Sequence, residues 1–385
     1  NDTATTEIYT QVNSSAASDV YKRQDTQSGR DDGRAMNIKK SVKRYYGETL
    51  QSTTDLKTGA CCTGDSLPEY IKKVLPLIHD DIKTKYYGCG SPIPLSIEGL
   101  KVLDVGCGTG RDCYIMSKLV GEGGFVYGID MTENQLAVAQ RYREEQTRRF
   151  AFTKPNVQFI LDDMESIEKH FARESLDLVT SNCVVNLAED KEVILQQVYN
   201  VLQSGGEFYF SDVYADRRIP DTIKDNEVLY GECLGGALYY RDFERIARTV
   251  GFADPRVVVN HVIPVNNDDV KKLIGDITFY SITYRLWKLE GLEDACEDYG
   301  QSATYLGGIP ETPLAFRLDG NHLFEKNKPE RICANTALML LQTRFKQFFK
   351  VTGDFKEHLG AFRDCSTTGN ADDQDAQPPV SESCC

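Results

Sequence analysis

The central part of the chain alternates short apolar runs with amphipathic segments. The five apolar runs have the length and residue types of buried strands, and they span 100–105, 125–130, 156–161, 176–181 and 207–213. The segments between them place apolar residues at helical spacing over 113–120, 133–150 and 190–202. Strands that alternate with helices of this length are typical of a parallel sheet covered on both faces. The pattern therefore predicts an α/β, Rossmann-like fold with a doubly wound, mostly parallel sheet.

The two ends of the chain have different patterns. Residues 1–36 are rich in Ser, Thr, Asp and Gln with few apolar residues, so we expect them to be disordered. An N-terminal arm follows, in which Pro68 opens a predicted helix that continues to about Lys85. The elements predicted downstream are a helix over 241–250, strands over 256–260 and 279–289, and a long amphipathic helix over 334–350. The predicted division is a main domain over 37–254, a smaller α+β domain over 255–365 and a disordered tail over 366–385.

Three glycines, Gly106, Gly108 and Gly110, separate the first predicted strand from the first helix within VLDVGCGTGRD at 102–112. A loop of this kind lets a ligand approach the backbone at a helix N-terminus, although it also serves as a plain turn. Asp104 lies inside the end of the first strand, just before the loop, and Asp130 ends the second strand. A carboxylate at the tip of the second strand can accept hydrogen bonds from a ribose diol. The loop and the two acids therefore indicate a site for a nucleoside-containing cofactor.

The sequence DVGCGTGRD followed by GID resembles the S-adenosylmethionine-binding half of class I methyltransferases, with a nicotinamide-binding Rossmann domain as the alternative. The resemblance implies that the glycines allow close backbone approach and that Asp130 binds the ribose hydroxyls. It also implies that Met131 packs on adenine, that Asp163 binds the adenine amino group and that Tyr87 lies over the methionine part. The expected cofactor-binding residues are Tyr87, Asp104, Gly106, Gly108, Gly110, Asp130, Met131, Asp163 and Met164.

Charge and composition narrow the class of ligand. The formal net charge is −14, so a nucleic-acid backbone is not an expected partner, and small-molecule chemistry is favoured. No apolar run reaches the length of about 18 residues that spans a membrane, and no secretory signal is recognisable. The 12 cysteines occur in a long chain without the character of a small secreted scaffold. That usage favours a reducing compartment and a cytoplasmic location.

Four cysteines lie in loops that the fold could bring together. Cys61, Cys89, Cys183 and Cys233 stand in TGAC, YYGCG, SNC and GEC, among small or turn-forming residues. The strand-end residues expected beside them are Asp104, Asp130, Asp163, Cys183 and Asp212, because ligands of such sheets bind beyond the carboxyl ends of the strands. A single free cysteine is usually a small buried hydrophobe, and Cys107 and Cys113 are interpreted in that way. Four cysteines beside one cofactor site instead indicate thiol chemistry.

The full set of motifs extends from about Val42 to Lys350. It comprises YYGCG, DVGCGTGRDCY, GIDMT, SNCVVNL, GGEFYFSDVY and GECLGGALYY, and it closely resembles the arsenite S-adenosylmethionine methyltransferases. The resemblance implies that Cys89, Cys183 and Cys233 bind trivalent arsenic and that Cys61 is a fourth catalytic cysteine. Arsenic(III) is a soft centre that prefers thiolates, and its lone pair is the nucleophile toward a sulfonium methyl group.

The same resemblance implies a redox partner. Methylation oxidises arsenic, so a thiol reductant of the thioredoxin or glutathione type is expected as co-substrate, and Cys61 near Cys89 could form a disulfide during turnover. Whether Cys61 or the adjacent Cys62 is the N-terminal thiol stays open. The expected substrate is arsenite or its thiol conjugates, the expected role is arsenic detoxification, and the expected form is a monomer.

Two other functions are alternatives. One is a methyltransferase that acts on a small organic carbon or oxygen nucleophile, in which the cysteines are incidental. The other is a cysteine-rich protein that binds zinc or a metalloid. Zinc sites usually pair their ligands two to four residues apart, and the four loop cysteines do not have that spacing.

Overall fold

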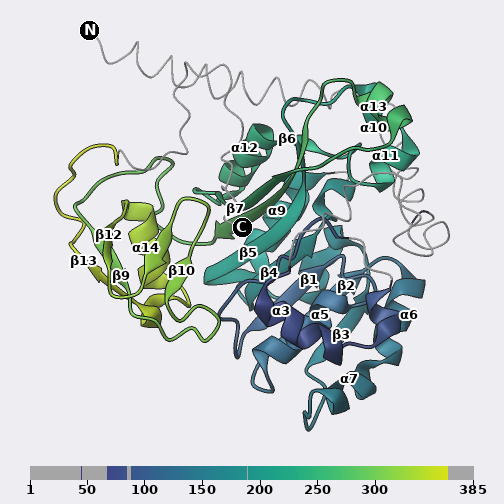
Figure 1. The fold of residues 1–385 in the computed structure, drawn as a ribbon, viewed down its shortest axis with the longest axis horizontal. Helices are drawn as coiled ribbons and strands as arrows, with labels where there is room; N and C mark the ends of the chain where they lie inside the picture. The colour runs from purple at the N-terminus through teal and green to yellow at the C-terminus, as the bar shows by residue number, and fades with distance from the viewer. Residues whose placement is uncertain (1–44, 46–66, 85–87, 189, 363–385) are drawn as a thin grey trace.

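The structure is a computed structural model, and it describes residues 45, 67–84, 88–188 and 190–362. The predicted disordered segments 1–36 and 366–385 lie outside these residues. Within them, a central sheet has the strand order β3-β2-β1-β4-β5-β8-β7 (Figure 1). Its strands are β1 (Lys101–Val105), β2 (Phe125–Asp130), β3 (Val157–Leu161), β4 (Leu176–Asn182), β5 (Leu202–Ala215), β7 (Arg256–Val262) and β8 (Phe279–Trp287). The strands β1 to β5 pair in parallel, so the predicted doubly wound, mostly parallel sheet is confirmed.

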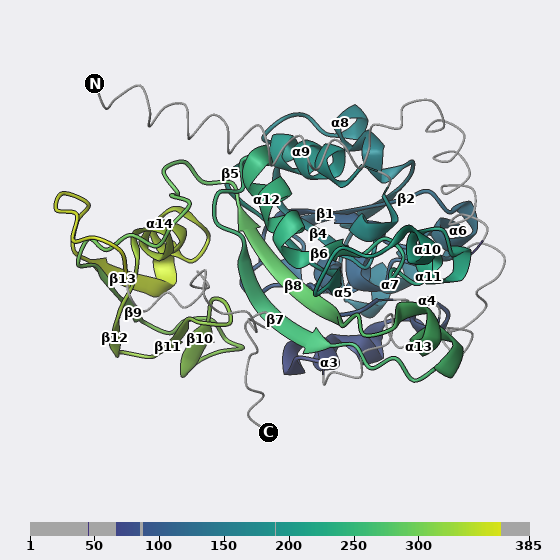
Figure 2. The same ribbon diagram turned by 90° about the horizontal axis from the view of Figure 1, so that it is seen from above.

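Helices cover both faces of the sheet, as its apolar strands require (Figure 2). The helices on one face are α8 (Ile167–His170), α9 (Lys191–Val201) and α12 (Tyr240–Val250). The helices on the other face are α3 (Glu69–Val74), α4 (Asp80–Lys83), α5 (Arg111–Val120), α6 (Glu133–Arg141) and α7 (Arg143–Arg149). Among the described helices, none combines the length and the hydrophobicity needed to cross a membrane.

Two predicted helices are broken in the structure. The helix expected from Pro68 to about Lys85 ends at Val74, and the chain continues as a 3-10 turn, η3 (Leu75–Leu77), before α4 begins. Pro76 lies in this turn, and it lacks the backbone N–H that a continuing helix needs. The helix expected over 133–150 is divided into α6 and α7 at Tyr142, whose ring stacks on His79 with a centroid distance of 3.8 Å.

The strands β7 and β8 belong to the central sheet. The sequence interpretation placed both in the C-terminal α+β domain, and the structure corrects that placement. β8 runs antiparallel to β5 over the register Glu207↔Trp287 to Ala215↔Phe279, and β7 runs antiparallel to β8. β8 is buried along its whole length. The apolar content of these strands therefore serves the main core.

The remaining C-terminal part forms a smaller α+β unit beside the β5–β8 end of the sheet (Figures 1 and 2). Its elements are β9 (Ser302–Tyr305), β10 (Ala315–Arg317), β11 (Leu323–Glu325), β12 (Pro329–Arg331), α14 (Ala334–Gln342) and β13 (Phe349–Thr352). The helix predicted over 334–350 is therefore too long. Phe349 instead pairs with Tyr305 as a strand and packs against Phe316 in the core of this unit.

Short helices form a cap beyond the carboxyl ends of the strands. The cap consists of α10 (Asp221–Lys224), α11 (Glu227–Gly231) and α13 (Asp268–Ile274), with the two-residue strand β6 (Leu238–Tyr239) on the end of β5 (Figure 1). Its buried residues, such as Ile223, Leu229 and Ile274, form one apolar cluster with Val213 at the end of β5. The cap therefore closes the edge of the sheet at which ligands of this fold class bind.

A buried ion-pair network joins the smaller unit to the sheet. Glu207 of β5 is fully buried, and its two carboxylate oxygens lie 2.5 Å from Arg285 Nε and 2.6 Å from Arg344 Nη2. Arg285 also donates to the carbonyl of Leu318, and Arg344 donates to the carbonyl of Leu95. One carboxylate thus compensates two buried guanidinium groups from different parts of the fold.

We predict that Glu207→Gln lowers the free energy of unfolding by about 3–5 kcal/mol, because it leaves two buried arginines without a counter-charge. Urea unfolding measures this loss. The matched control is Glu174→Gln, which breaks the pair between an exposed Glu174 and Lys288, and its expected cost is below about 1 kcal/mol. Equal effects of the two substitutions would contradict the role given to Glu207.

Candidate active site

A cavity opens at the carboxyl ends of β1, β2 and β4, where the glycine loop turns into α5. It is partly open to solvent and is lined by the glycine loop and by residues at the ends of β2 and β4. Gly106 and Gly108 have left-handed backbones, with φ of 73° and 53°. A Cβ on Gly106 would lie 2.3 Å from Val184 Cγ2, whereas nothing lies within 4 Å of a Cβ built on Gly108. The loop therefore packs on one side and leaves its other side open to a ligand.

Most of the predicted cofactor-binding residues meet at this cavity. Its lining includes Asp104, Gly106, Gly108, Asp130, Met131 and Met164. Gly110 instead caps α5 and packs against Phe159. Asp163 is absent from the described lining, and its carboxylate accepts a hydrogen bond from Glu165 N at 2.9 Å. Tyr87 lies outside the described residues.

Asp130 organises the loop as well as facing the cavity. Its Oδ2 accepts a hydrogen bond from Gly108 N and its Oδ1 accepts one from Thr132 N, both at 2.8 Å. The carboxylate therefore ties the tip of β2 to the glycine loop. It stands at the strand tip where ribose hydroxyls bind in related folds.

Asp104 is buried beneath the loop. Its Oδ1 accepts a hydrogen bond from Thr180 Oγ1 at 2.9 Å, and Cys113 Sγ lies 3.3 Å from its Oδ2. Burial, with a smaller contribution from the nearby Asp112, raises the pKa of Asp104 to about 8. This acid is therefore protonated in the folded protein near neutral pH.

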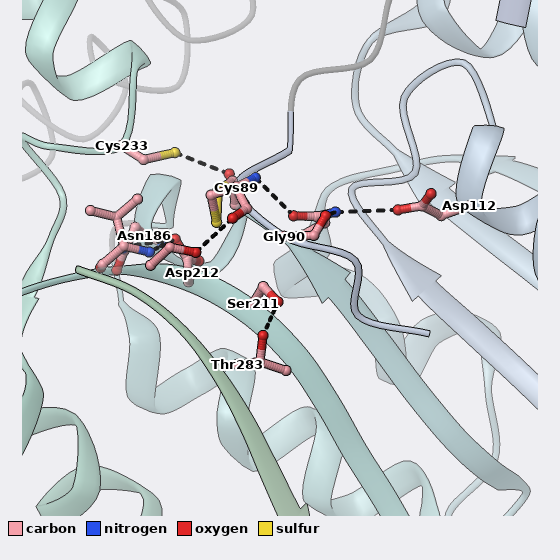
Figure 3. The surroundings of a disulfide bond; sticks show 12 residues. Cys89, Gly90, Asp112, Asn186, Ser211, Asp212, Cys233 and Thr283 are labelled. Atoms are coloured by element: carbon pink, nitrogen blue, oxygen red, sulfur yellow. Dashed lines mark hydrogen bonds between the residues drawn. A yellow bond between two sulfur atoms is a disulfide. The ribbon is translucent and has the colours of Figure 1, made fainter. Parts of the chain in front are cut away.

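Three of the four predicted catalytic cysteines gather next to the cavity. Cys89 and Cys183 form a disulfide, and the thiol of Cys233 lies 3.1 Å from the carbonyl oxygen of Cys183 (Figure 3). The sequence analysis paired Cys89 with Cys61, which lies outside the described residues; in the structure the partner of Cys89 is Cys183. Cys183 also lines the cavity. It is thus the direct link between the cysteine cluster and the candidate cofactor site.

The cysteine cluster is enclosed by apolar side chains. Cys89, Cys183 and Cys233 are at most 2% exposed and belong to the apolar cluster of the cap. A carboxylate, Asp212 in the carboxyl-terminal part of β5, is also fully buried there, and burial raises its pKa to about 7. The ligand atoms of Cys183, Asp212 and Cys233 lie within 4.8 Å of one another. Soft sulfur donors in a dry pocket suit a thiophilic centre.

Asn182 is a site residue that the sequence analysis missed. Its Oδ1 accepts a hydrogen bond from Cys89 N at 3.1 Å, while its Nδ2 donates to Gly90 O and to Asp112 Oδ2 (Figure 3). It therefore fixes the Cys89 segment beside the end of β4. Its position directly before Cys183 was the available signal. Further lining residues without a prior assignment are Thr109, Arg111, Asp112, Ile129, Thr132, Gln135, Val184 and Leu187.

Cys107 lies within the glycine loop, where it also lines the cavity, and Cys113 lies on α5; both are separate from the cysteine cluster. Both are buried thiols beside Gly128, as expected for small core residues. Burial raises the pKa of Cys107 to about 11 and raises the pKa of Cys113 well above its ordinary value. A thiol that stays protonated is a poor nucleophile and a poor ligand. The raised pKa values of both thiols therefore agree with their interpretation as small core residues.

Known proteins resemble the chain over most of its length. Residues 97–260 match a family model described as a methyltransferase domain. An arsenite methyltransferase of Aquipseudomonas alcaligenes is 47% identical over 348 residues, which are 90% of this chain and 99% of that protein. The arsenite methyltransferase of Mus musculus is 44% identical, covering 83% of this chain and 84% of that protein. The crystal structure of CrArsM, an arsenic(III) S-adenosylmethionine methyltransferase from Chlamydomonas reinhardtii, superposes with a TM-score of 0.75 at 45% identity and covers 77% of this chain and all of that one.

The raised pKa of Asp104 predicts a dependence of stability on pH. Between its ordinary value of 3.8 and about 8, the folded protein holds a proton that the unfolded chain has released. The free energy of unfolding therefore falls as the pH rises through this range. Asp104→Asn keeps the shape of the side chain and removes the titration, so its stability is expected to fall less between pH 5 and pH 8. Urea unfolding at several pH values measures both slopes, and equal slopes would refute the protonated state of Asp104.

Proposed function

The chain belongs to the arsenite methyltransferase family of S-adenosylmethionine-dependent enzymes, and from that premise we propose that its cysteine cluster presents trivalent arsenic for methylation. The observation that carries the proposal is that Cys183 belongs both to the cysteine cluster and to the lining of the cavity. This residue lies in the buried cluster with Cys89 and Cys233, and it lines the cavity beside the glycine loop. An arsenic atom bound by the cysteine cluster would thus lie next to the cavity proposed for the methyl donor.

The proposed arsenic ligands are the thiolates of Cys89, Cys183 and Cys233. Three sulfur ligands leave one side of arsenic(III) open, and the lone pair on that side is the nucleophile. Because Cys183 faces the cavity and the other two are closed in by the cap, the open side is expected to face the cavity. The apolar surroundings, with Leu187 shared between cap and cavity, keep water away from the lone pair.

The cavity suits S-adenosylmethionine, which supplies an electrophilic sulfonium methyl group when bound. The open side of Gly108 gives room for close approach of the backbone, and Asp130 stands ready to accept hydrogen bonds from the ribose hydroxyls. The half-buried Met131 and Met164 offer apolar surface for the adenine. No protein group is needed as a general base, because the nucleophile is a lone pair.

The disulfide fits the redox balance of the proposed reaction. Formation of an arsenic–carbon bond raises the formal oxidation state of arsenic by two electrons. Oxidation of the two thiolates of Cys89 and Cys183 to a disulfide returns two electrons and restores trivalent arsenic. A thiol reductant of the thioredoxin or glutathione type then supplies two thiols and leaves as a disulfide. Cys61 can relay this exchange, and the reducing cytoplasm is the proposed setting, with a monomer as the proposed form.

The test is to incubate the purified protein with arsenite, a thiol reductant and labelled S-adenosylmethionine and to separate the arsenic products. We predict that Cys183→Ser and Cys233→Ser abolish arsenite methylation because arsenic loses a soft ligand. Cys296→Ser, in the C-terminal unit, is the matched control and is expected to keep the parent rate. A Cys233→Ser variant as fast as the parent would refute the proposal, and stoichiometric zinc without any response to arsenite would favour the zinc-binding alternative.

A second prediction concerns the cofactor. Asp130→Ala removes the acceptor at the tip of β2, so binding of S-adenosylmethionine is expected to weaken by about 1–3 kcal/mol while arsenite binding persists. Isothermal titration calorimetry measures both affinities. Asp163→Ala is the matched comparison, and because this carboxylate lies outside the described lining its effect is expected to be smaller. An Asp130→Ala variant with the parent affinity would show that the ribose binds elsewhere.

A further inference from the structure

Asp212 is a buried carboxylate to which the proposed chemistry assigns no task. It lies in the buried carboxyl-terminal part of β5, is fully inaccessible and lies beside both Cys183 and Cys233. Its Oδ1 accepts hydrogen bonds from Asn186 Nδ2 and from Val213 N, both at 2.8 Å, and its Oδ2 accepts one from Asn186 N at 3.0 Å. Three donors converge on one carboxylate, and two of them belong to Asn186 (Figure 3).

Asn186 connects the two segments that carry these cysteines. It lies in the 3-10 turn η5 (Val185–Leu187), three residues after Cys183, and it is 2% exposed. The chain that follows Cys233 rests directly on it, because a Cβ on Gly236 would lie 2.0 Å from Asn186 O. Tyr230, in the helix before Cys233, donates to Ala188 O at 3.4 Å. The Asn186 turn is therefore the surface on which the Cys233 segment sits.

Both cysteines have backbones that need such support. Cys183 has φ of 57° and Cys233 has φ of 66°, in the left-handed region that side chains other than glycine rarely adopt. Such conformations persist where the surroundings determine them from several directions. The disulfide to Cys89 holds Cys183 only in the oxidised protein, whereas the hydrogen bonds between Asp212 and Asn186 involve no sulfur atom.

We propose that Asp212 and Asn186 are positioning residues that keep the sulfur atoms of Cys183 and Cys233 at a separation that trivalent arsenic can bridge once the disulfide is reduced. This inference rests on the proposed function, since it names the groups that prepare the same site. An ionised carboxylate suits the task because all its hydrogen-bonding positions are acceptors, and here each of the three approaching groups is a donor. An amide at position 212 would set its own NH₂ group against one of these donors.

The test uses Asp212→Asn, Asn186→Ala and the double variant in the reduced full-length protein. The positioning role predicts that the KM for arsenite rises at least ten-fold in Asp212→Asn, while the KM for S-adenosylmethionine and the pH profile of kcat stay unchanged. The KM for arsenite in the double variant is expected to be no higher than in the more impaired of the two single variants. The reason is that substitutions in residues that act as one unit do not have additive effects. Asp242→Asn is the matched control, since it removes a buried carboxylate on α12, away from the cavity and the cysteines, and is expected to keep the parent KM values.

Three outcomes would overturn the inference. An unchanged KM for arsenite in Asp212→Asn would remove the positioning role. A kcat that falls with a shifted pH profile would make Asp212 a participant in proton transfer instead. A parallel rise of both KM values with a lowered Tm would make the pair a support of the whole fold.

A binding measurement separates this inference from the proposed function. Phenylarsine oxide binds two neighbouring thiols without any methyl donor. Binding at this site is measured as the amount of the probe bound by the parent protein minus the amount bound by the Cys233→Ser variant. We expect Asp212→Asn to reduce that difference by ten-fold or more in affinity. If the parent captures the probe at this site but does not methylate arsenite, the proposed function fails while the positioning role can still be tested.

Discussion

The site depends on the position of β4 between β1 and β5. The register pairs Ser181 with Val105 on one side and Asn182 with Ser211 on the other. The residue that follows, Cys183, therefore emerges between the glycine loop after β1 and Asp212 in the carboxyl-terminal part of β5. A slip of one residue would turn the side chains of β4 to the opposite faces and would separate the cysteine cluster from the cavity. Strand pairing thus brings the two halves of the chemistry together.

Much of this arrangement could be predicted from local patterns. The apolar runs that became β1 to β4 are short and bounded by turn residues, so their ends were placed almost correctly, and Asp104, Asp130 and Cys183 followed from those ends. The strand-end rule then predicted that these residues share one edge. Prediction was less successful where long-range pairing decides the structure. β8 joins the sheet by antiparallel pairing with β5, and no local pattern distinguishes such a strand from one in a separate domain.

The groups that prepare the site were harder to predict because their roles come from tertiary contacts. From the local sequence, Asn182 and Asn186 are typical turn residues. Only the fold shows that Asn182 accepts a hydrogen bond from Cys89 N and that Asn186 donates one to Asp212. The pairing of Cys89 with Cys183 likewise joins residues 94 positions apart. The break at Pro76, by contrast, follows from a local rule that the apolar spacing of the helix obscured.

The features of the site that lower the stability of the fold are concentrated at one edge of the sheet. Stabilising interactions elsewhere in the fold offset them. The backbones of Cys183 and Cys233 are in the left-handed region, which costs free energy. The burial of Asp104 and of Asp212 costs free energy as well. The apolar cores on both faces of the sheet offset these penalties at a distance from the cavity. The cap performs both tasks at once, because the apolar side chains that bury Cys233 also exclude water from the proposed arsenic ligands. A more polar cap would lower the desolvation cost of Asp212. It would also let water reach the thiolates, which would weaken their binding of a soft centre. The desolvation of Asp212 and the proposed thiol chemistry therefore have the same cause, which is the exclusion of water from the carboxyl ends of β4 and β5.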